Sequence, residues 1–298
     1  MSKLSWTLLL VASMAGIAAF YPIVKALDNS IDPYLLAFLR FLIALLALLP
    51  IMAFRRSLRL PSPREWPLFI FIALCGAGAT VLVVIGIGQT NSVVSAILLN
   101  TNPLIIALLA PLLISEQLTV KKSLALTAGF IGVILIVLNG QSLSALINSE
   151  YFWGSFIVLI AALLSGLNKI YSKGLVRTYD GLYVTFFAVV LGTSVLSVIV
   201  GFTGKFGQIT QLTGTGVISV LLIGIVASAV PWTIWTSSLK HLDVHVAASF
   251  MLLIPIFAMF YSFLFLSEQF TVWMLLGLLL TSGGVYLVQR EEKVVPNI

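Results

Sequence analysis

The chain has 298 residues, of which 60% are hydrophobic and only 9% charged, and its mean hydropathy is +1.14. Soluble domains carry about 45–50% apolar and about 25% charged residues, so this composition excludes a soluble fold and indicates a protein that lies in lipid. The net charge of +6 is distributed over short gaps between apolar runs, which argues against a nucleic-acid-binding face.

Apolar runs long enough to cross a membrane follow one another along the whole chain. A spanning helix needs about 20 such residues, and we expect ten helices, near 4–26, 33–54, 66–89, 92–115, 121–139, 151–173, 181–203, 214–238, 244–266 and 271–289. The first run is too long for a typical signal peptide, so we expect it to be retained. The predicted fold class is an all-α integral membrane protein with ten transmembrane helices.

The placement of lysine and arginine predicts the orientation. With a cytoplasmic N-terminus, twelve of the sixteen basic residues fall in cytoplasmic segments, and only Lys25 and Lys205 fall on the opposite side. Short cytoplasmic loops carry an excess of basic residues. We therefore predict that both termini are cytoplasmic.

The two halves of the sequence repeat each other. Pro103 and Glu116 are thirteen residues apart, and so are Pro255 and Glu268, which lie 152 positions later. The same offset matches Ala96 with Ala248, Gly132 with Gly284 and Val133 with Val285, and an offset of 150 matches Gly16 and Tyr21 with Gly166 and Tyr171. We expect two five-helix repeats, residues 1–140 and 151–290.

An odd number of helices in each copy predicts that the second repeat enters the membrane from the other side. Inverted repeats of this kind are typical of secondary transporters, whose substrate site lies between the two halves. The alternative is that duplication only enlarged a helical bundle. No nucleotide loop, zinc spacing or multi-cysteine site occurs, and Cys75 is the one cysteine, so we expect no cofactor, no metal and no catalytic residue.

A proline inside an apolar helix, a Ser-Glu-Gln-x-Thr boundary and a glycine-rich helix occur twice, at residues 95–139 and 247–289. With the Arg40-Phe41 pair, this pattern resembles the drug/metabolite transporter superfamily and its EamA-type ten-helix branch. The resemblance implies an inner-membrane carrier, often an exporter of amino acids, related metabolites or drugs, with a cavity lined by the third, fourth, eighth and ninth helices. Its motifs are specific for the fold and not for the substrate.

Polar residues beside the two prolines are the first candidates for a substrate site. Pro103 frees a backbone carbonyl, and the amides of Asn100 and Asn102 either satisfy the helix or present donors and acceptors to a solute. Asparagine also serves as glue between helices. Ser249 precedes Pro255 in the second copy and is a further candidate.

Aromatic and basic residues inside the spans form a second set of candidates. Trp232 and Trp235 share a helix face and form either an interfacial belt or an aromatic wall for a solute. Tyr21, Tyr171 and Tyr261 are further cavity candidates.

Two basic residues, Arg40 and Lys169, lie within predicted spans, where charge indicates function by default. Arg40 is expected to reach the external headgroups, to pair with Asp32 or Asp28, or to bind an anion. Lys169 is expected to extend toward the cytoplasmic surface or to contact substrate.

All ten carboxylates lie in loops or at helix ends. If protons drive transport, the candidates include Glu116 and Glu268, although capping explains both equally well, so proton coupling, exchange and facilitated diffusion all stay open. Pro103, Pro255, Arg40, Glu116 and Glu268 are expected to have structural or gating roles.

The sequence therefore predicts a secondary transporter that moves a small polar or amphipathic metabolite across the bacterial inner membrane by alternating access, in the direction of export. Its expected partners are the small-molecule substrate and the lipid bilayer; the solute, the driving ion and the oligomeric state stay open. A channel is the first alternative. An intramembrane lipid-modifying enzyme is a weaker one, because His241 and His245 fall in a predicted cytoplasmic loop.

Overall fold

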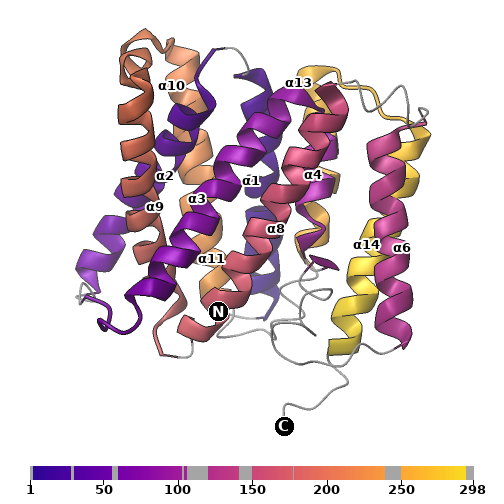
Figure 1. Cartoon of the computed structure of the whole chain (residues 1–298), viewed down its shortest axis with the longest axis horizontal. Helices are drawn as coiled ribbons and strands as arrows, with labels where there is room; N and C mark the ends of the chain where they lie inside the picture. Colours follow the sequence, from indigo (N-terminus) through magenta and orange to yellow (C-terminus); the bar gives the residue numbers. More distant parts are fainter. Residues whose placement is uncertain are drawn as a thin grey trace.

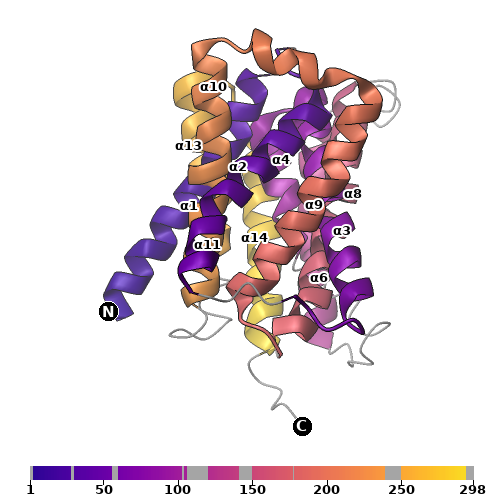
Figure 2. The ribbon, with the colours of Figure 1, turned by 90° about the vertical axis from the view of Figure 1, so that its left-hand side faces the viewer.

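The computed structural model describes residues 3–27, 30–55, 60–102, 104–105, 120–140, 150–176, 178–238 and 250–292. All the regular secondary structure of the described residues is helical. The helices run along one common direction as a bundle, and the start of its first helix and the end of its last lie toward the same end of it (Figures 1 and 2). The first-half helices are α1 (Lys3–Ala26), α2 (Pro33–Phe54), α3 (Trp66–Gln89), α4 (Ser92–Leu99) and α6 (Val120–Leu138).

The second half contains α8 (Glu150–Val176) and α9 (Gly181–Thr203), followed by a short 3-10 helix, Lys205–Gln211. One continuous helical rod then comprises α10 (Gly214–Leu221), a π-helical segment (Leu222–Ala229, η2) and α11 (Val230–Ser238). A 3-10 turn (Phe250–Leu252, η3) leads into α13 (Leu253–Leu266), and α14 (Val272–Glu292) ends the described chain.

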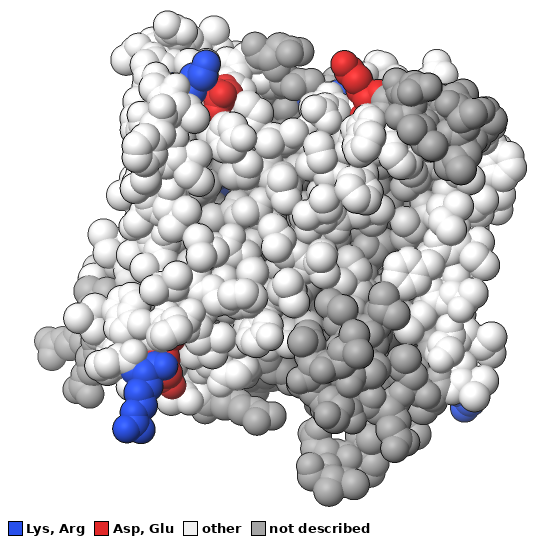
Figure 3. Space-filling model, viewed as in Figure 1, with Lys and Arg blue, Asp and Glu red and all other residues white. Residues whose placement is uncertain are grey.

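Six helices of the described chain are long and apolar enough to cross a membrane, and three shorter apolar helices accompany them. The long ones are Ser5–Ala26, Pro33–Phe54, Trp66–Gln89, Glu150–Val176, Gly181–Thr203 and Gly214–Trp235. They match six of the predicted spans closely. On the face in Figure 3, most visible charged side chains lie near the two ends, with a broad uncharged band between them. The chain is therefore a multi-pass membrane protein.

Local sequence signals fix where the helices begin and end. The Asp32 carboxylate accepts hydrogen bonds from the backbone N–H groups of Tyr34 (2.9 Å) and Leu35 (3.3 Å), and Pro33 occupies the first helical position of α2. The Asn91 side chain caps α4 in the same way. Gly204 ends α9 with a φ of 67°, a left-handed conformation that glycine adopts without steric penalty.

The helices of the two halves pack against each other throughout. α3 packs on α8 and α9, α1 packs on α13, α11 and η2, and α2 packs on α9 and η2. α4 contacts both α8 and α13. The pair α6 and α14 stands at one edge of the bundle (Figure 1).

The crossing of α6 and α14 is unusually close because small residues line it. A Cβ added at Gly132 would lie 2.8 Å from the carbonyl oxygen of Gly277 and 2.7 Å from the backbone nitrogen of Thr281. A Cβ at Gly284 would lie 2.7 Å from the carbonyl oxygen of Ala125 and 2.8 Å from the Cα of Gly129. Glycine here allows backbone-to-backbone contact, the usual way in which helices associate inside lipid.

Candidate functional site

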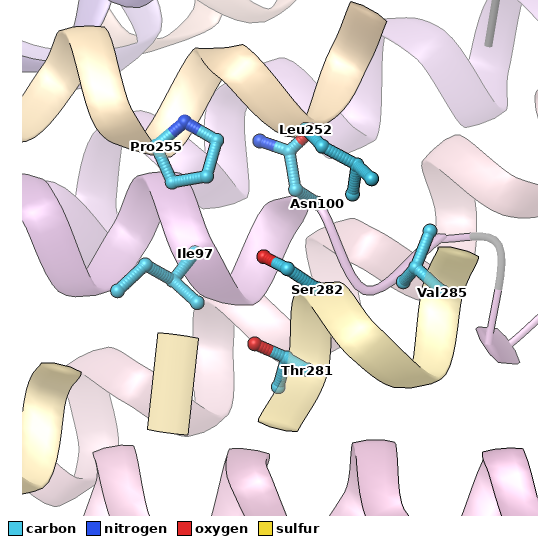
Figure 4. Close-up of a pocket in the computed structure, with 7 residues that line it drawn as sticks. All are labelled: Ile97, Asn100, Leu252, Pro255, Thr281, Ser282 and Val285. Atoms are coloured by element: carbon cyan, nitrogen blue, oxygen red, sulfur yellow. The ribbon is translucent and has the colours of Figure 1, made fainter. Parts of the chain in front are cut away.

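A small cavity lies where α4, α13 and α14 meet. Seven residues line it, namely Ile97, Asn100, Leu252, Pro255, Thr281, Ser282 and Val285 (Figure 4). Its volume is about 10 Å³, which is room for about one water molecule. The structure thus brings together Asn100 and Pro255, two candidates from opposite halves of the sequence.

The polar groups of this cavity come from α4 and α14. The Asn100 amide nitrogen donates to the carbonyl of Ala96 (2.7 Å), and the Thr281 hydroxyl donates to that of Gly277 (2.7 Å). The hydroxyls of Thr281 and Ser282 both turn from α14 into the space that faces Ile97 (Figure 4). The other four lining residues, Ile97, Leu252, Pro255 and Val285, are apolar.

Asn102 lies two residues after Asn100 and is buried, with 3% of its surface exposed. Its amide nitrogen donates to the Ser165 hydroxyl of α8 (3.3 Å), while its side-chain oxygen has no hydrogen-bond partner among the described residues. Buried polar atoms are nearly always paired. An unfilled acceptor on a contact between the two halves is a feature that a ligand donor would complete.

We call the contact surface between the two halves of the chain the seam. At one end of the seam, Glu268 connects the two halves. Its carboxylate accepts hydrogen bonds from the backbone N–H of Ser92 (3.2 Å) and from the Ser92 hydroxyl (2.8 Å) at the start of α4. The Ser92 hydroxyl has one proton, which it donates to this carboxylate. The buried Ser262 hydroxyl of α13 therefore donates to the Ser92 hydroxyl oxygen, at 2.6 Å. A carboxylate is also favoured at a helix N-terminus. We call Ser92, Ser262 and Glu268 the Glu268 latch.

Arg40 is buried between α1, α2 and the π-helical segment, with 9% of its surface exposed. Its Nε donates to the Ser228 hydroxyl (2.8 Å), and its Cζ lies 4.0 Å from the ring centre of Phe20 and 5.7 Å from that of Trp232. The expected pairing with Asp32 is wrong, because Asp32 caps α2 instead and forms no ion pair with Arg40. Asp28 lies outside the described residues.

Ser228 also explains the π-helical geometry beside Arg40. Its hydroxyl donates to the carbonyl of Ile223, five residues earlier (2.8 Å). Such widened turns occur often at functional sites. Sequence reasoning did not identify Ser228, because a serine in an apolar run carries no pattern of its own.

The remaining candidates are spread over the bundle. Trp232 packs edge-on against Phe41 (6.2 Å) as well as Arg40, and Trp235 packs on the core. Tyr21 is buried next to Phe20, Tyr171 packs edge-on against Phe71 (4.9 Å), and Tyr261 stacks on Phe257. Lys169 is exposed on α8. None of these six residues lines the small cavity. Three further candidates, Ser249, Pro103 and Glu116, lie outside the described residues.

Sequence reasoning missed four hydroxyl residues besides Ser228: Ser92, Ser165, Ser262 and Thr281. Each makes a hydrogen bond described above, and for Ser92, Ser165 and Ser262 this hydrogen bond joins the two halves. Their signal in the sequence is weak because serine and threonine are common in membrane helices, where they bond to their own backbone. Within the described chain no group of three His, Cys, Asp or Glu side chains has the arrangement of a metal site.

Comparison with known proteins places these features in context. The model of the EamA-like transporter family matches residues 4–138 and again residues 152–290. An uncharacterized transporter of Archaeoglobus fulgidus is 27% identical over 96% of this chain and 97% of its own. A probable terminal-alkyne amino-acid exporter of Streptantibioticus cattleyicolor is 26% identical over 98% of this chain and 95% of its own.

Other relatives and a solved structure agree with these matches. The uncharacterized transporter YoaV of Bacillus subtilis is 24% identical over 87% of this chain and 88% of its own. One solved crystal structure covers 99% of this chain and 100% of its own, with a TM-score of 0.66 and 16% identity. At that identity the likeness concerns the fold alone.

Proposed function

Because the chain belongs to the EamA-like transporter family, we propose that it is a secondary transporter that exports a small polar or amphipathic metabolite across the bacterial inner membrane. The proposed mechanism is alternating access between two inverted five-helix repeats, residues 1–140 and 151–290. The relative described as a probable amino-acid exporter favours amino acids and related metabolites as cargo.

The observation that carries this proposal is the reciprocity of the α6–α14 crossing. Gly132 meets Gly277 and Thr281, and Gly284 meets Ala125 and Gly129. With the repeat offset of 152 positions, Gly132 is equivalent to Gly284, and positions 277 and 281 are equivalent to positions 125 and 129. Each contact thus maps onto its counterpart when the halves are exchanged, which is the behaviour of two copies related by a two-fold axis.

The main contacts elsewhere in the bundle support the same exchange. When the halves are exchanged, the contact of α3 with α8 corresponds to the contact of α1 with η2 and α11. The contact of α4 with α8 corresponds to that of α13 with α1, and the contact of α3 with α9 corresponds to that of η2 with α2. The contacts α2–α9 and α4–α13 each map onto themselves. Two similar halves with an interface of this kind can exchange conformations, so that a site between them opens to one side of the membrane and then to the other.

In this mechanism the Glu268 latch closes one end of the seam. The positions related to Ser92 and Ser262 by the repeat offset are Val244 and Ala110, neither of which has a hydroxyl. Side chains at these two positions therefore cannot form the hydroxyl hydrogen bonds that Ser92 and Ser262 form. This difference favours a resting conformation that is closed at the Glu268 end.

Counterflow uptake into proteoliposomes tests the proposed function. Vesicles loaded with a panel of amino acids and related metabolites are diluted into labelled substrate, with and without a pH gradient. A carrier gives transient accumulation for at least one compound, and a response to the gradient shows proton coupling. Single-channel current would instead indicate a channel, and absence of accumulation for every compound would contradict transport of this class.

A further inference from the structure

Arg40 combines burial, charge and unused hydrogen-bonding capacity inside the membrane-spanning part of the chain. It is the eighth residue of α2, about 10 Å from the start of that helix at 1.5 Å per residue. Only its Nε has a hydrogen-bond acceptor among the described residues, the Ser228 hydroxyl. A guanidinium carries five N–H donors, so four have no described protein acceptor.

A buried cation at this depth in the membrane needs an anion to balance its charge. Charged side chains inside membrane spans face the bundle interior, pair with opposite charge and mark substrate or ion pathways. Among the described residues no carboxylate forms an ion pair with Arg40; the described ion pair joins Arg55 and Asp180 (3.1 Å). The rings of Phe20 and Trp232 shield the guanidinium from lipid and stabilise it by cation–π contact, but they accept no hydrogen bond in its plane.

The location of Arg40 suits a transport site. Phe20 and Arg40 come from the first half of the chain, whereas Ser228 and Trp232 come from the second half. An anion bound here would touch both repeats at once and would respond to their relative movement. The Ser228 hydroxyl fixes Nε and leaves the two Nη groups, which form the fork that matches a carboxylate.

We propose that Arg40 binds the carboxylate of a monovalent organic anion or zwitterion at the interface of the two halves. One buried cation balances one negative charge, which favours a carboxylate over a phosphate dianion. The aromatic surroundings of Phe20, Tyr21 and Trp232 suit an apolar group beside the carboxylate. This inference rests on the proposed transport function and specifies the class of its substrate.

Binding can be tested in detergent, separately from transport. Titration of the purified protein with butyrate at constant ionic strength, followed by tryptophan fluorescence and by the thermal unfolding midpoint, is expected to give a saturable response because Trp232 lies near Arg40. Neutral butyramide, of nearly the same shape, is expected to give none, and inorganic phosphate a weaker one. An equal response to butyrate and butyramide overturns the proposal, as does no response to butyrate.

Variants distinguish Arg40 from other cations. Arg40→Gln is expected to weaken butyrate binding at least tenfold, and Arg40→Lys, which keeps the charge and loses the fork, at least fivefold. Lys205→Gln removes an exposed charge beyond α9 and is expected to bind like the parent protein. If Arg40→Gln does not fold, Arg40→Lys decides the outcome, and unchanged affinity in that variant refutes the proposal.

Asp28 provides the remaining control, since an ion pair with Asp28 is the competing explanation of how the charge of Arg40 is balanced. Asp28→Asn is expected to bind butyrate within twofold of the parent protein. A gain of tenfold or more in the affinity of this variant for butyrate would mean that Asp28 occupies the anion site, and it would overturn the proposal. Counterflow with neutral cargo alone would contradict only the Arg40 inference, whereas butyrate binding without any counterflow would contradict only the transport function.

Discussion

Asn102 and Asn168 are similar amides with different surroundings. Asn168 of α8 donates to the carbonyl of Ile72 in α3 (2.6 Å) and so joins two helices. Asn102 donates to Ser165 over a longer distance, 3.3 Å, and its side-chain oxygen has no partner among the described residues. Asn168 has the contacts of a structural residue, whereas the side-chain oxygen of Asn102 is an open acceptor that a ligand donor would complete.

Substitution should separate these two roles. Asn102→Ala is expected to lower the initial counterflow rate about tenfold, corresponding to ~1.4 kcal/mol, because a ligand contact is lost. Folding should change little, since the removed acceptor was unpaired and the lost hydrogen bond to Ser165 is long, at 3.3 Å. Asn168→Ala is expected to leave the rate of the folded protein nearly unchanged and to lower stability by about 1 kcal/mol. Counterflow and thermal unfolding measure the two effects, and full transport by Asn102→Ala would remove this residue from the site.

At the scale of helices, close packing and hydrogen bonding hold the two halves at different places. The α6–α14 pair depends on backbone contact through glycine, whereas α4 and α13 are joined at one end by the Glu268 latch. The contact through glycine depends on close backbone packing and on no side-chain hydrogen bond that water could replace. A hydrogen-bonded latch can open when water replaces its partners.

Adjacent glycines of α14 offer a matched test of the close contact. A Cβ at Gly284 meets backbone atoms of α6 at 2.7 to 2.9 Å, whereas a Cβ at Gly283 meets nothing within 4 Å. Gly284→Ala is therefore expected to destabilise the protein by about 1–3 kcal/mol. Gly283→Ala should be neutral or stabilising by up to ~1 kcal/mol, because alanine is the better helix former. Thermal unfolding of both variants measures this, and equal midpoints would contradict the contact.

The Glu268 latch can be locked by a disulfide. In a Cys75→Ser background, Ser92→Cys with Ser262→Cys replaces two hydroxyls whose oxygens are 2.6 Å apart. Oxidation is expected to reduce counterflow at least tenfold, and a reductant should restore it, if this end must open during each cycle. Each single cysteine variant, treated with the same oxidant, serves as the control. Full transport by the cross-linked protein would show that this end stays closed.

At the scale of the whole molecule, the bundle has two chemically different ends. The end that contains the α2–α3 connection has the Arg55–Asp180 pair and the hydrogen bond from Tyr179 to Glu65. That hydrogen bond raises the pKa of Tyr179, which lies between α8 and α9. The opposite end contains the 3-10 helix after α9, whose Gln208 accepts from the Asp32 backbone N–H (2.9 Å). The distribution of basic residues in the sequence predicts that the first end faces the cytoplasm.

Labelling with a membrane-impermeant maleimide tests this orientation in intact cells. In the Cys75→Ser background, Leu60→Cys is expected to be protected and Gly207→Cys to react, because both positions are exposed at opposite ends of the bundle. Permeabilised cells should label at both positions, which is the control for accessibility. Reaction of Leu60→Cys alone in intact cells would reverse the predicted topology.

Local composition was sufficient to predict the membrane class and the bounds of the long helices. Apolar length decides whether a helix spans lipid, and capping residues such as Asp32 and Asn91 act within their own turn, so neighbours in the sequence carry this information. The offset between Gly132 and Gly284 is likewise visible in the sequence, without the structure that shows what each glycine contacts. The match to the EamA-like transporter family agrees with the sequence resemblance.

Only the tertiary structure decided which polar groups meet. Ser92 and Ser262 are 170 positions apart, and Arg40 and Ser228 are 188 apart. Nothing in either local sequence specifies such a partner, because hydrogen bonds between distant helices depend on how the helices rotate and cross. For that reason the sequence could offer Asp32 only as one of several possible partners of Arg40, while the packing of α2 on the second half gave it Ser228 of the π-helical segment and Trp232 of α11 instead.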